Sequence, residues 1–357
     1  MDEATARNHL VCPACRRGPL EIRPFEAHDG AVSNGVLFCG PCREWYRIEN
    51  GLPVLLLPAL RDPERDRGFR DRFRKHWDGW DSARGVGSAA GPGDAAKLES
   101  IAFFRDAAKS YDRGITDSPF WNAFDASFLD AVRRSARGRG ILVEAGGGTG
   151  RLALPLSRDF GTVLCFDLSE EMAARARDRF AGRPNAHAFV ADAENIPLKP
   201  GTADCVVFSG VLTYLDSPGT AIAETARILA DDGVMLGQEN NLSLLRPLFN
   251  LLKKSMKCWT AKSYPEDAAL SLAGLEEWLA AAGLDSSVWT EIFLPPHVFS
   301  LLPSRWTDGV LRLTNSLGRR APILSRHGGL LLFSAVKGIA SGKAVQPRSS
   351  AKGTLRG

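Results

Sequence analysis

The stretch ILVEAGGGTGRLALPL, residues 141–156, constrains this chain more than any other. A short apolar run ends in Glu144, and glycines follow at alternate positions, Gly146, Gly148 and Gly150. An apolar run of this length predicts a buried parallel strand, and glycines permit positive φ or let a ligand lie against the backbone. The free N–H groups at the start of the next helix favour a polar or anionic ligand group. We therefore predict a nucleotide-type binding loop.

The spacing of the glycines separates the kinds of loop. A Walker loop requires G-K-[ST], whereas Gly150 is followed by Arg151. A dinucleotide fingerprint counted from Gly148 would end on Ala153, which its looser form allows, so that interpretation is weakened but stays open, as does a plain glycine turn. The best match is acid-x-G-x-G-x-G, led by Glu144. In this loop the chain resembles the class I S-adenosylmethionine-dependent methyltransferases.

A second apolar strand is predicted in VLCFDLSEEM, residues 163–172. It ends in Asp167, 23 residues after Glu144. In α/β nucleotide folds a carboxylate at this place holds a ribose, because it accepts two hydrogen bonds at once. A dinucleotide site would use the same acid. Asp167 could instead cap the following helix, as Ser169 also could.

Three more segments follow in the order that the methyltransferase family has, so that the resemblance covers roughly residues 108–240. FVADAENIPL resembles the third binding segment, ADCVVFSGVLTYL the fourth strand with its loop, and ETARILADDGVMLGQEN the helix, turn and fifth strand. The resemblance implies that Asp192 faces the adenine amino group, that the backbone of Ala193 lies near the ring, and that Tyr111 lies in a lid. The cofactor contacts that it implies are Glu144, Gly146, Gly148, Gly150, Asp167, Leu168, Met172, Asp192, Ala193 and Ser209.

The fold class expected from this order is α/β, a Rossmann-like, doubly wound sheet of seven strands. LAGLEEWLAAAGL, residues 272–284, predicts a helix ending at Gly283. The segments 286–296 and 328–338 predict two final strands, antiparallel at the sheet edge. Between them lies a helical insertion, about residues 297–327, which is longer than a hairpin needs and is expected to cover the active site.

Two C-x-x-C pairs, Cys12 with Cys15 and Cys39 with Cys42, form a second strong pattern. Two such turns brought together give the four thiolates that Zn²⁺ prefers, and a segment this short would need the metal in order to fold. Four free structural cysteines are the alternative. The following EWYRIENGLPVLLLP resembles the small zinc-ribbon proteins that partner tRNA and protein methyltransferases.

The predicted organisation has four parts: a zinc-ribbon-like module (1–60), an amphipathic helix with a linker (61–97), the methyltransferase domain (98–338) and a disordered basic tail (339–357). The helix in residues 61–81 is expected to pack against the catalytic domain, with docking of a partner as the alternative. Residues 246–259 are apolar and basic, and predict a cap helix, a membrane-surface helix or an RNA-facing strip.

Composition adds limits on class and compartment. Apolar residues make up 44% of the chain and charged residues 24%, which is ordinary for a globular protein. No apolar run approaches the ~18 residues of a membrane span, and the acidic, polar N-terminus predicts no signal peptide. Paired C-x-x-C motifs favour metal binding in a reducing compartment, so we expect a cytoplasmic protein.

Methyl transfer from a sulfonium mainly requires alignment of the reactants, so no universal catalytic residue is expected. A general base matters only for an acceptor that must lose a proton. The candidates, judged by place alone, are Tyr214, Glu239 and His297. The loop SGVLTYLDSP lacks the Asn-Pro-Pro-aromatic motif, which weakens methylation of nucleobase or glutamine amino groups.

Two functions of different class remain. The first is S-adenosylmethionine-dependent methylation of a small molecule, such as a lipid or a secondary metabolite. The second is a zinc-ribbon rRNA or tRNA methyltransferase, and a non-catalytic cofactor-binding scaffold is a further alternative. Glutamates offset most of the ribbon's arginines, whereas a phosphate-binding surface needs a basic cluster. We therefore prefer the small-molecule acceptor over RNA.

Overall fold

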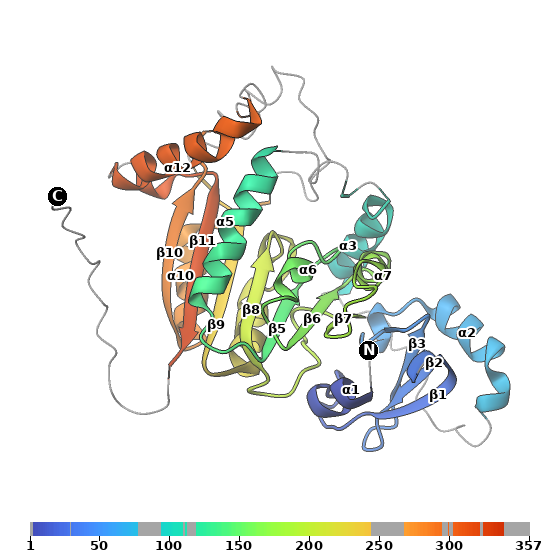
Figure 1. Ribbon diagram of the computed structural model, residues 1–357. Coiled ribbons are helices and arrows are strands. Elements are labelled where there is room, and N and C mark those ends of the chain that lie inside the picture. The colour runs from blue at the N-terminus through green and yellow to red at the C-terminus, as the bar shows by residue number, and fades with distance from the viewer. Residues whose placement is uncertain are drawn as a thin grey trace.

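The computed structural model describes residues 3–28, 30–77, 94–109, 111–112, 119–243, 268–294, 299, 303–321 and 324–338. Within these ranges the chain forms a four-stranded and a seven-stranded sheet that lie side by side (Figure 1). His297, the stretch 246–259 and the tail 339–357 lie outside the described residues. No helix in the described ranges is both long and apolar enough to cross a membrane.

The large sheet has the strand order β10-β11-β9-β8-β5-β6-β7. Its strands are β5 (Ile141–Ala145), β6 (Thr162–Asp167), β7 (Ala186–Val190), β8 (Ala203–Ser209), β9 (Leu229–Asn240), β10 (Leu284–Glu291) and β11 (Leu330–Lys337). Six of these strands run in one direction and β11 runs in the other, since β11 pairs antiparallel with both β9 and β10 while the remaining pairs are parallel. The expected doubly wound fold and the antiparallel final pair are therefore confirmed.

Helices cover both faces of the large sheet (Figure 1). They are α3 (Asp94–Ala107), α5 (Pro119–Ser135), α6 (Ala153–Leu156), α7 (Glu170–Arg179), α8 (Pro218–Ile228), α10 (Leu272–Ala281) and α12 (Ser304–Arg320), with short 3₁₀ turns η3 (Leu212–Tyr214) and η4 (Leu324–Arg326). Alternate residues of a strand feed opposite cores: Val143 and Ala145 join one cluster, and Leu142 joins the other. A strand buried on both faces must be apolar throughout, which explains the continuous run before Glu144.

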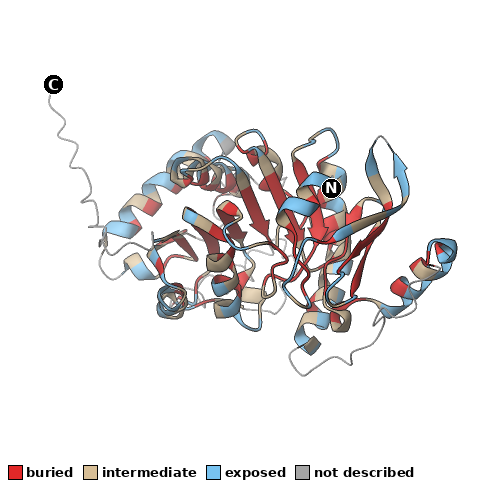
Figure 2. Ribbon diagram, turned by 90° about the horizontal axis from the view of Figure 1, so that it is seen from below, coloured by how far each residue is buried: buried red, intermediate tan, exposed pale blue. Residues whose placement is uncertain are grey.

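The N-terminal module is a separate antiparallel sheet with the order β1-β2-β3-β4. Its elements are α1 (Glu3–His9), β1 (Glu21–His28), β2 (Ala31–Phe38), β3 (Trp45–Glu49) and β4 (Leu52–Pro53). Most strands of the two sheets are largely buried (Figure 2). Strand β1 is the exception, because much of it is exposed.

The helical segment after this sheet contradicts one expectation. It forms η1 (Pro58–Leu60), α2 (Pro63–Arg72) and η2 (Arg74–His76). Phe69, Phe73 and Trp77 pack against Phe38 and Trp45 of the small sheet, not against the catalytic domain. The expectation was wrong because it treated the ribbon as held by metal alone. The ribbon sheet in fact has an apolar outer face, and α2 covers it.

The small sheet is joined to the β7 edge of the large one through backbone contacts. Val54, directly after β4, forms a parallel bridge with Val190, and Leu55 N–H donates to the Val190 carbonyl at 2.8 Å. A second, antiparallel bridge joins Leu10 to Leu198. Backbone hydrogen bonding therefore continues from the seven-stranded sheet into the ribbon.

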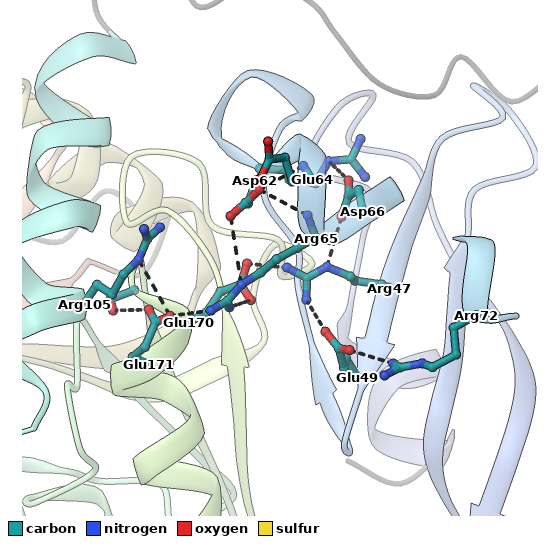
Figure 3. A network of polar contacts seen from close by, with 12 residues as sticks. Arg47, Glu49, Asp62, Glu64, Arg65, Asp66, Arg72, Arg105, Glu170 and Glu171 are labelled. Atoms are coloured by element: carbon teal, nitrogen blue, oxygen red, sulfur yellow. Dashed lines mark hydrogen bonds and ion pairs between the residues drawn. The ribbon is translucent and has the colours of Figure 1, made fainter. Parts of the chain in front are cut away.

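An ion-pair network reinforces this junction (Figure 3). The Arg47 side chain is 1% exposed and contacts Asp66, Glu49 and Glu170, the last at the start of α7. Arg65 of α2 binds Glu170 at 2.8 Å as well. The two arginines thus link the ribbon, α2 and α7 in one connected cluster.

Replacing Arg47 with methionine should destabilise the protein by about 3 kcal/mol, because it leaves the buried Asp66 without its main cation and removes one of the two arginines that pair with the half-buried Glu170. The matched control is Arg72→Met. Arg72 also pairs with Glu49, but its side chain is 51% exposed, so the loss should stay below about 1 kcal/mol. Urea unfolding followed by tryptophan fluorescence measures both. Equal losses in the two variants would contradict the proposed importance of burial.

Candidate active site

A pocket of about 740 Å³ opens at the carboxyl ends of the parallel strands. In open α/β sheets ligands bind at this edge. Predicted site residues that line it are Tyr111, Gly146, Gly148, Asp167, Leu168, Met172, Asp192, Ala193, Ser209, Tyr214 and Glu239. The structure therefore brings together residues that the sequence spreads over more than a hundred positions.

Two residues of the predicted set lie beneath the loop instead of facing the pocket. Glu144 is 3% exposed, and its Oε2 accepts a hydrogen bond from Ala153 N–H at 2.8 Å, which ties β5 to the start of α6. Burial raises the pKa of Glu144 to about 8. Gly150 has φ of 73°, and a Cβ there would lie 2.7 Å from the ring of Phe180. Glycine at 150 thus serves packing, and neither residue lines the pocket.

Gly146 is required by close approach of the next loop. Its φ is 62°, and a Cβ would lie 2.6 Å from the side chain of Val211. Any side chain here would push away the loop after β8. The backbone of the glycine loop is consequently bare where it faces the pocket.

Asp167, at the end of β6, has its carboxylate anchored by backbone donors. Oδ2 accepts from Gly148 N–H and Oδ1 from Ser169 N–H, each at 2.9 Å. The cap of α7 is Ser169, whose side chain accepts from Met172 N–H. Burial raises the pKa of Asp167 to about 6. The carboxylate is thus held at the pocket wall with lone pairs left for a ligand.

Asp192 lies one strand further along, after β7, and is 4% exposed. Its Oδ1 accepts from Glu194 N–H at 2.9 Å, while Oδ2 lies 2.6 Å from Lys97 Nζ on α3. Lys97 also contacts Glu194 at 2.7 Å. Burial raises the pKa of Asp192, and the ammonium of Lys97 opposes that change. α3 therefore closes over this side of the pocket.

Glu239 is fully buried at the end of β9, and both of its oxygens are engaged. Oε1 accepts from Val211 and Leu212 N–H at 2.9 and 3.0 Å, and Oε2 accepts from the backbone and hydroxyl of Thr213 at 3.3 Å. Burial raises the pKa of Glu239 to about 7. These contacts favour a role in positioning the loop after β8 over that of a general base.

Several residues that line the pocket are not predicted by any pattern in the sequence. They are Lys97, Phe104, Trp121, Arg151 and Gln238. Lys97 lies in a segment that has the composition of a linker. The spacing of Phe104 and Trp121 is that of ordinary helix-packing residues. Gln238 donates to Ser209 Oγ at 2.7 Å, but its buried Oε1 has no partner among the described residues. A buried acceptor without a hydrogen-bond partner costs free energy, so Gln238 Oε1 is suited to accept a hydrogen bond from a ligand.

The four cysteines of the ribbon converge although they come from two separate turns. Their sulfur atoms all lie within 4.8 Å of one another, with Cys12 to Cys42 and Cys15 to Cys39 each at 3.5 Å. Burial raises the pKa of Cys12 to about 11. The hydroxyl of Tyr46 lies 3.1 Å from Cys12 Sγ. Four thiol sulfurs at this separation fit a tetrahedral divalent cation such as Zn²⁺.

Comparisons with known families agree with both halves of this description. Residues 143–237 match the family described as Methyltransferase domain, and residues 8–51 match the Trm112p-like protein family. The chain is 32% identical over 136 residues to a malonyl-[acyl-carrier protein] O-methyltransferase of Geobacter sulfurreducens, covering 36% of this chain and 51% of that protein. This chain thus spans about half the length of that curated relative.

Two further comparisons cover the ribbon and the fold. A UPF0434 protein of Methylobacillus flagellatus is 39% identical over 61 residues, which is 15% of this chain and 87% of that protein. A solved S-adenosylmethionine-dependent methyltransferase from Thermotoga maritima aligns with 24% identity and a TM-score of 0.47, covering 66% of this chain and 99% of that one.

The sheet order, the glycine loop at its carboxyl edge and the two family matches lead to one conclusion. The chain combines a doubly wound sheet of the class I methyltransferase type, in which residues 143–237 match the Methyltransferase domain family, with an N-terminal ribbon module in which residues 8–51 match the Trm112p-like protein family.

Proposed function

We propose that the enzyme methylates a small molecule with an apolar part, a lipid or a secondary metabolite. The observation that carries this is the length of the pocket, which runs from Asp167 and Asp192 to Asn240 and Leu330 at the ends of β9 and β11. Its volume of about 740 Å³ is in the upper part of the ~300–1,000 Å³ range of small-molecule sites. There is thus room for an acceptor beside the cofactor.

The acceptor end of this pocket is aromatic. Phe104 of α3 meets Tyr214 at a ring-centroid distance of 5.7 Å, and Trp121 of α5 lines the same pocket. Rings of this kind favour an apolar or conjugated acceptor. Gln238 Oε1, which no other described residue contacts by a hydrogen bond, offers one acceptor for a hydroxyl, amine or ammonium group. The malonyl-[acyl-carrier protein] O-methyltransferase relative also supports an acyl-type acceptor.

The cofactor would occupy the β5, β6 and β7 side. Asp167 would accept hydrogen bonds from the ribose, Asp192 from the adenine amino group, and the bare backbone at Gly146 and Gly148 would face the methionine part. S-adenosylmethionine supplies an activated methyl group on a sulfonium. The protein's contribution is alignment and exclusion of water, with α3 and the loop held by Glu239 as the covering elements.

The ribbon is proposed to hold one structural Zn²⁺ through Cys12, Cys15, Cys39 and Cys42. A four-thiolate site without an open position stabilises a fold and performs no chemistry. Thiolate sites are typical of reducing compartments, which supports a cytoplasmic location. The packing of α2 supports a ribbon domain that extends to about residue 77, beyond the predicted boundary at 60.

RNA is the weaker acceptor because three of the six arginines in residues 1–60 are paired with carboxylates. Arg16 binds Glu224 at 2.7 Å, Arg23 binds Glu21 at 2.9 Å, and Arg47 is buried in the network at the junction. Phosphate binding requires cations that remain available at the surface. The Arg16 and Arg47 pairs link the ribbon to the large domain, and together with the Arg23 pair they reduce the positive charge available to a nucleic acid.

The test is transfer of label from S-adenosylmethionine carrying a radioactive methyl group. The purified enzyme is incubated with a cell extract, which is then separated into organic-soluble, protein and RNA fractions. We expect label in the organic fraction, absent when the enzyme carries Asp167→Ala. Label that stays with RNA and disappears on ribonuclease treatment would contradict the proposal.

A further inference from the structure

Exposed apolar side chains are concentrated in one part of the molecule. Six large apolar side chains are exposed among the described residues, and four of these lie between positions 306 and 324. They are Trp306 (58% exposed), Leu313 (59%), Leu317 (58%) and Leu324 (42%). A fifth, Leu242 (62%), follows Asn241, whose amide donates to the carbonyls of Arg326 and Gly328 at 3.0 and 2.7 Å. Globular surfaces rarely gather large apolar side chains in this way.

Three of these side chains form a stripe along α12. Trp306, Leu313 and Leu317 are separated by seven and four residues, so they share one side of the helix. We call these three residues the apolar stripe. Another side of α12 is already occupied, since Leu311 and Asn315 are buried and Asn315 Oδ1 accepts from Ile292 N–H at 2.9 Å. The stripe is therefore held outward by the packing of the same helix.

Positive charge lies beside the stripe. Residues 303–327 contain five arginines and one aspartate. On α12, Arg312 pairs with Asp308 and Arg319 with Glu291, while Arg305 and Arg320 are exposed. An amphipathic helix with Trp and Leu next to arginines is suited to the boundary between lipid headgroups and acyl chains.

We propose that α12 binds to the surface of an anionic phospholipid membrane, with the apolar stripe inserted among the headgroups and the arginines contacting lipid phosphates. The charge favours lipid over a second copy of this chain, because self-pairing would bring two arginine-rich faces together. It also favours lipid over nucleic acid, because the stripe would leave two leucines and a tryptophan against a polyanion.

The position of α12 suggests how membrane binding would serve the enzyme, because the helix lies near the acceptor end of the pocket. Asn315 donates to Glu291 Oε2 at 3.0 Å, and Glu291 pairs with Leu330, which pairs with Asn240. Leu330 and Asn240 line the pocket. Two strand spacings, roughly 10 Å, therefore separate the anchor of the helix from the acceptor end. This inference rests on the proposed small-molecule function. It identifies the acceptor as a membrane lipid that reaches the pocket from the bilayer surface.

The experiment is sedimentation of the full-length protein with vesicles of phosphatidylcholine alone or mixed with phosphatidylglycerol. We expect the wild type to sediment with the mixed vesicles. Leu313→Asp/Leu317→Asp should lower the vesicle partition coefficient by at least about tenfold, because two charged side chains replace the inserted leucines. Arg305→Ser/Arg320→Ser should remove most of the preference for anionic lipid.

The matched control is Ala273→Asp/Ala280→Asp, which adds the same two charges at exposed positions of α10 and should sediment as the wild type does. Circular dichroism and S-adenosylmethionine titration verify that each variant is folded. A wild type that stays in solution with both vesicles would overturn the proposal, as would undiminished binding of the leucine variant. A dimer that the leucine variant dissociates, without vesicle binding, would assign the stripe to a second copy. Sedimentation needs no acceptor, so its result is independent of whether methyl transfer to a small molecule is found.

Discussion

Asp167→Ala should weaken S-adenosylmethionine binding by about a hundredfold. A carboxylate that accepts two hydrogen bonds from a ribose contributes roughly 1.5–3 kcal/mol for each bond to a charged group, and about 2.7 kcal/mol corresponds to a factor of a hundred. The substitution also removes the acceptor of Gly148 N–H, which is 2.9 Å from Asp167 Oδ2, so the glycine loop loses a support. Isothermal titration calorimetry measures the dissociation constant directly.

Two variants separate loss of the ribose contact from loss of loop support. Asp167→Asn keeps an oxygen that can accept from Gly148 N–H but loses one ligand acceptor, so its affinity should lie between those of alanine and wild type. Asp178→Ala removes a carboxylate on α7 whose side chain is 68% exposed, and should leave affinity unchanged. An Asp167→Ala protein that binds as tightly as the wild type would refute the ribose assignment.

The same residue predicts how binding depends on pH. Burial raises the pKa of Asp167 to about 6 in the free protein, and the ionised form is the one that accepts two hydrogen bonds. As pH falls below about 6, the carboxyl takes up a proton and affinity should decline, approaching tenfold per pH unit. Between pH 7 and 8 the group is already ionised, so affinity should be nearly constant. In Asp167→Asn this acid-side decline should be lost.

The seven-stranded sheet could be predicted from sequence because its determinants are local and ordered. Each buried strand is a continuous apolar run, and Glu144 and Asp167 mark the ends of two of them. The glycine pattern indicates backbone that must adopt positive φ, which the structure has at Gly146, Gly148 and Gly150. The family's five segments in sequence then give the strand order, since connections in such folds are restricted.

What could not be predicted depends on contacts between distant segments. The pattern of Phe69, Phe73 and Trp77 indicates an apolar helix face but not which partner covers it, and the partner is the ribbon sheet. Lys97 lies in a segment with linker composition, and its role depends on Asp192, 95 residues away. Its place at the end of β9 makes Glu239 a candidate base, but its two oxygens accept hydrogen bonds from the 211–213 loop, a contact between segments that no local sequence pattern indicates.

Cys39→Ser should remove bound zinc and destabilise the whole protein by several kcal/mol. Cys39 is fully buried in the sulfur cluster at the centre of the ribbon, and a domain this small is expected to take much of its stability from a bound metal in addition to its apolar packing. Structural zinc sites provide ~10 kcal/mol of folding free energy in isolated peptides, and loss of one thiolate forfeits a large part of it. Elemental analysis should give about one zinc per wild-type chain and almost none in the variant, and thermal unfolding should show a marked drop in Tm.

The effect should reach the catalytic domain, because the ribbon continues the edge of its sheet. Val54 bridges to Val190, and Val190 ends the strand that leads to Asp192. S-adenosylmethionine affinity should therefore fall in Cys39→Ser, whereas Cys205→Ala, a buried thiol of β8 outside the metal cluster, should keep the zinc and lose stability only by the smaller cost of a cavity. A Cys39→Ser protein that is free of metal and has unchanged Tm would show that the ribbon folds on its core alone. In that case the four sulfurs would be structural thiols, and the junction with β7 would not depend on a metal.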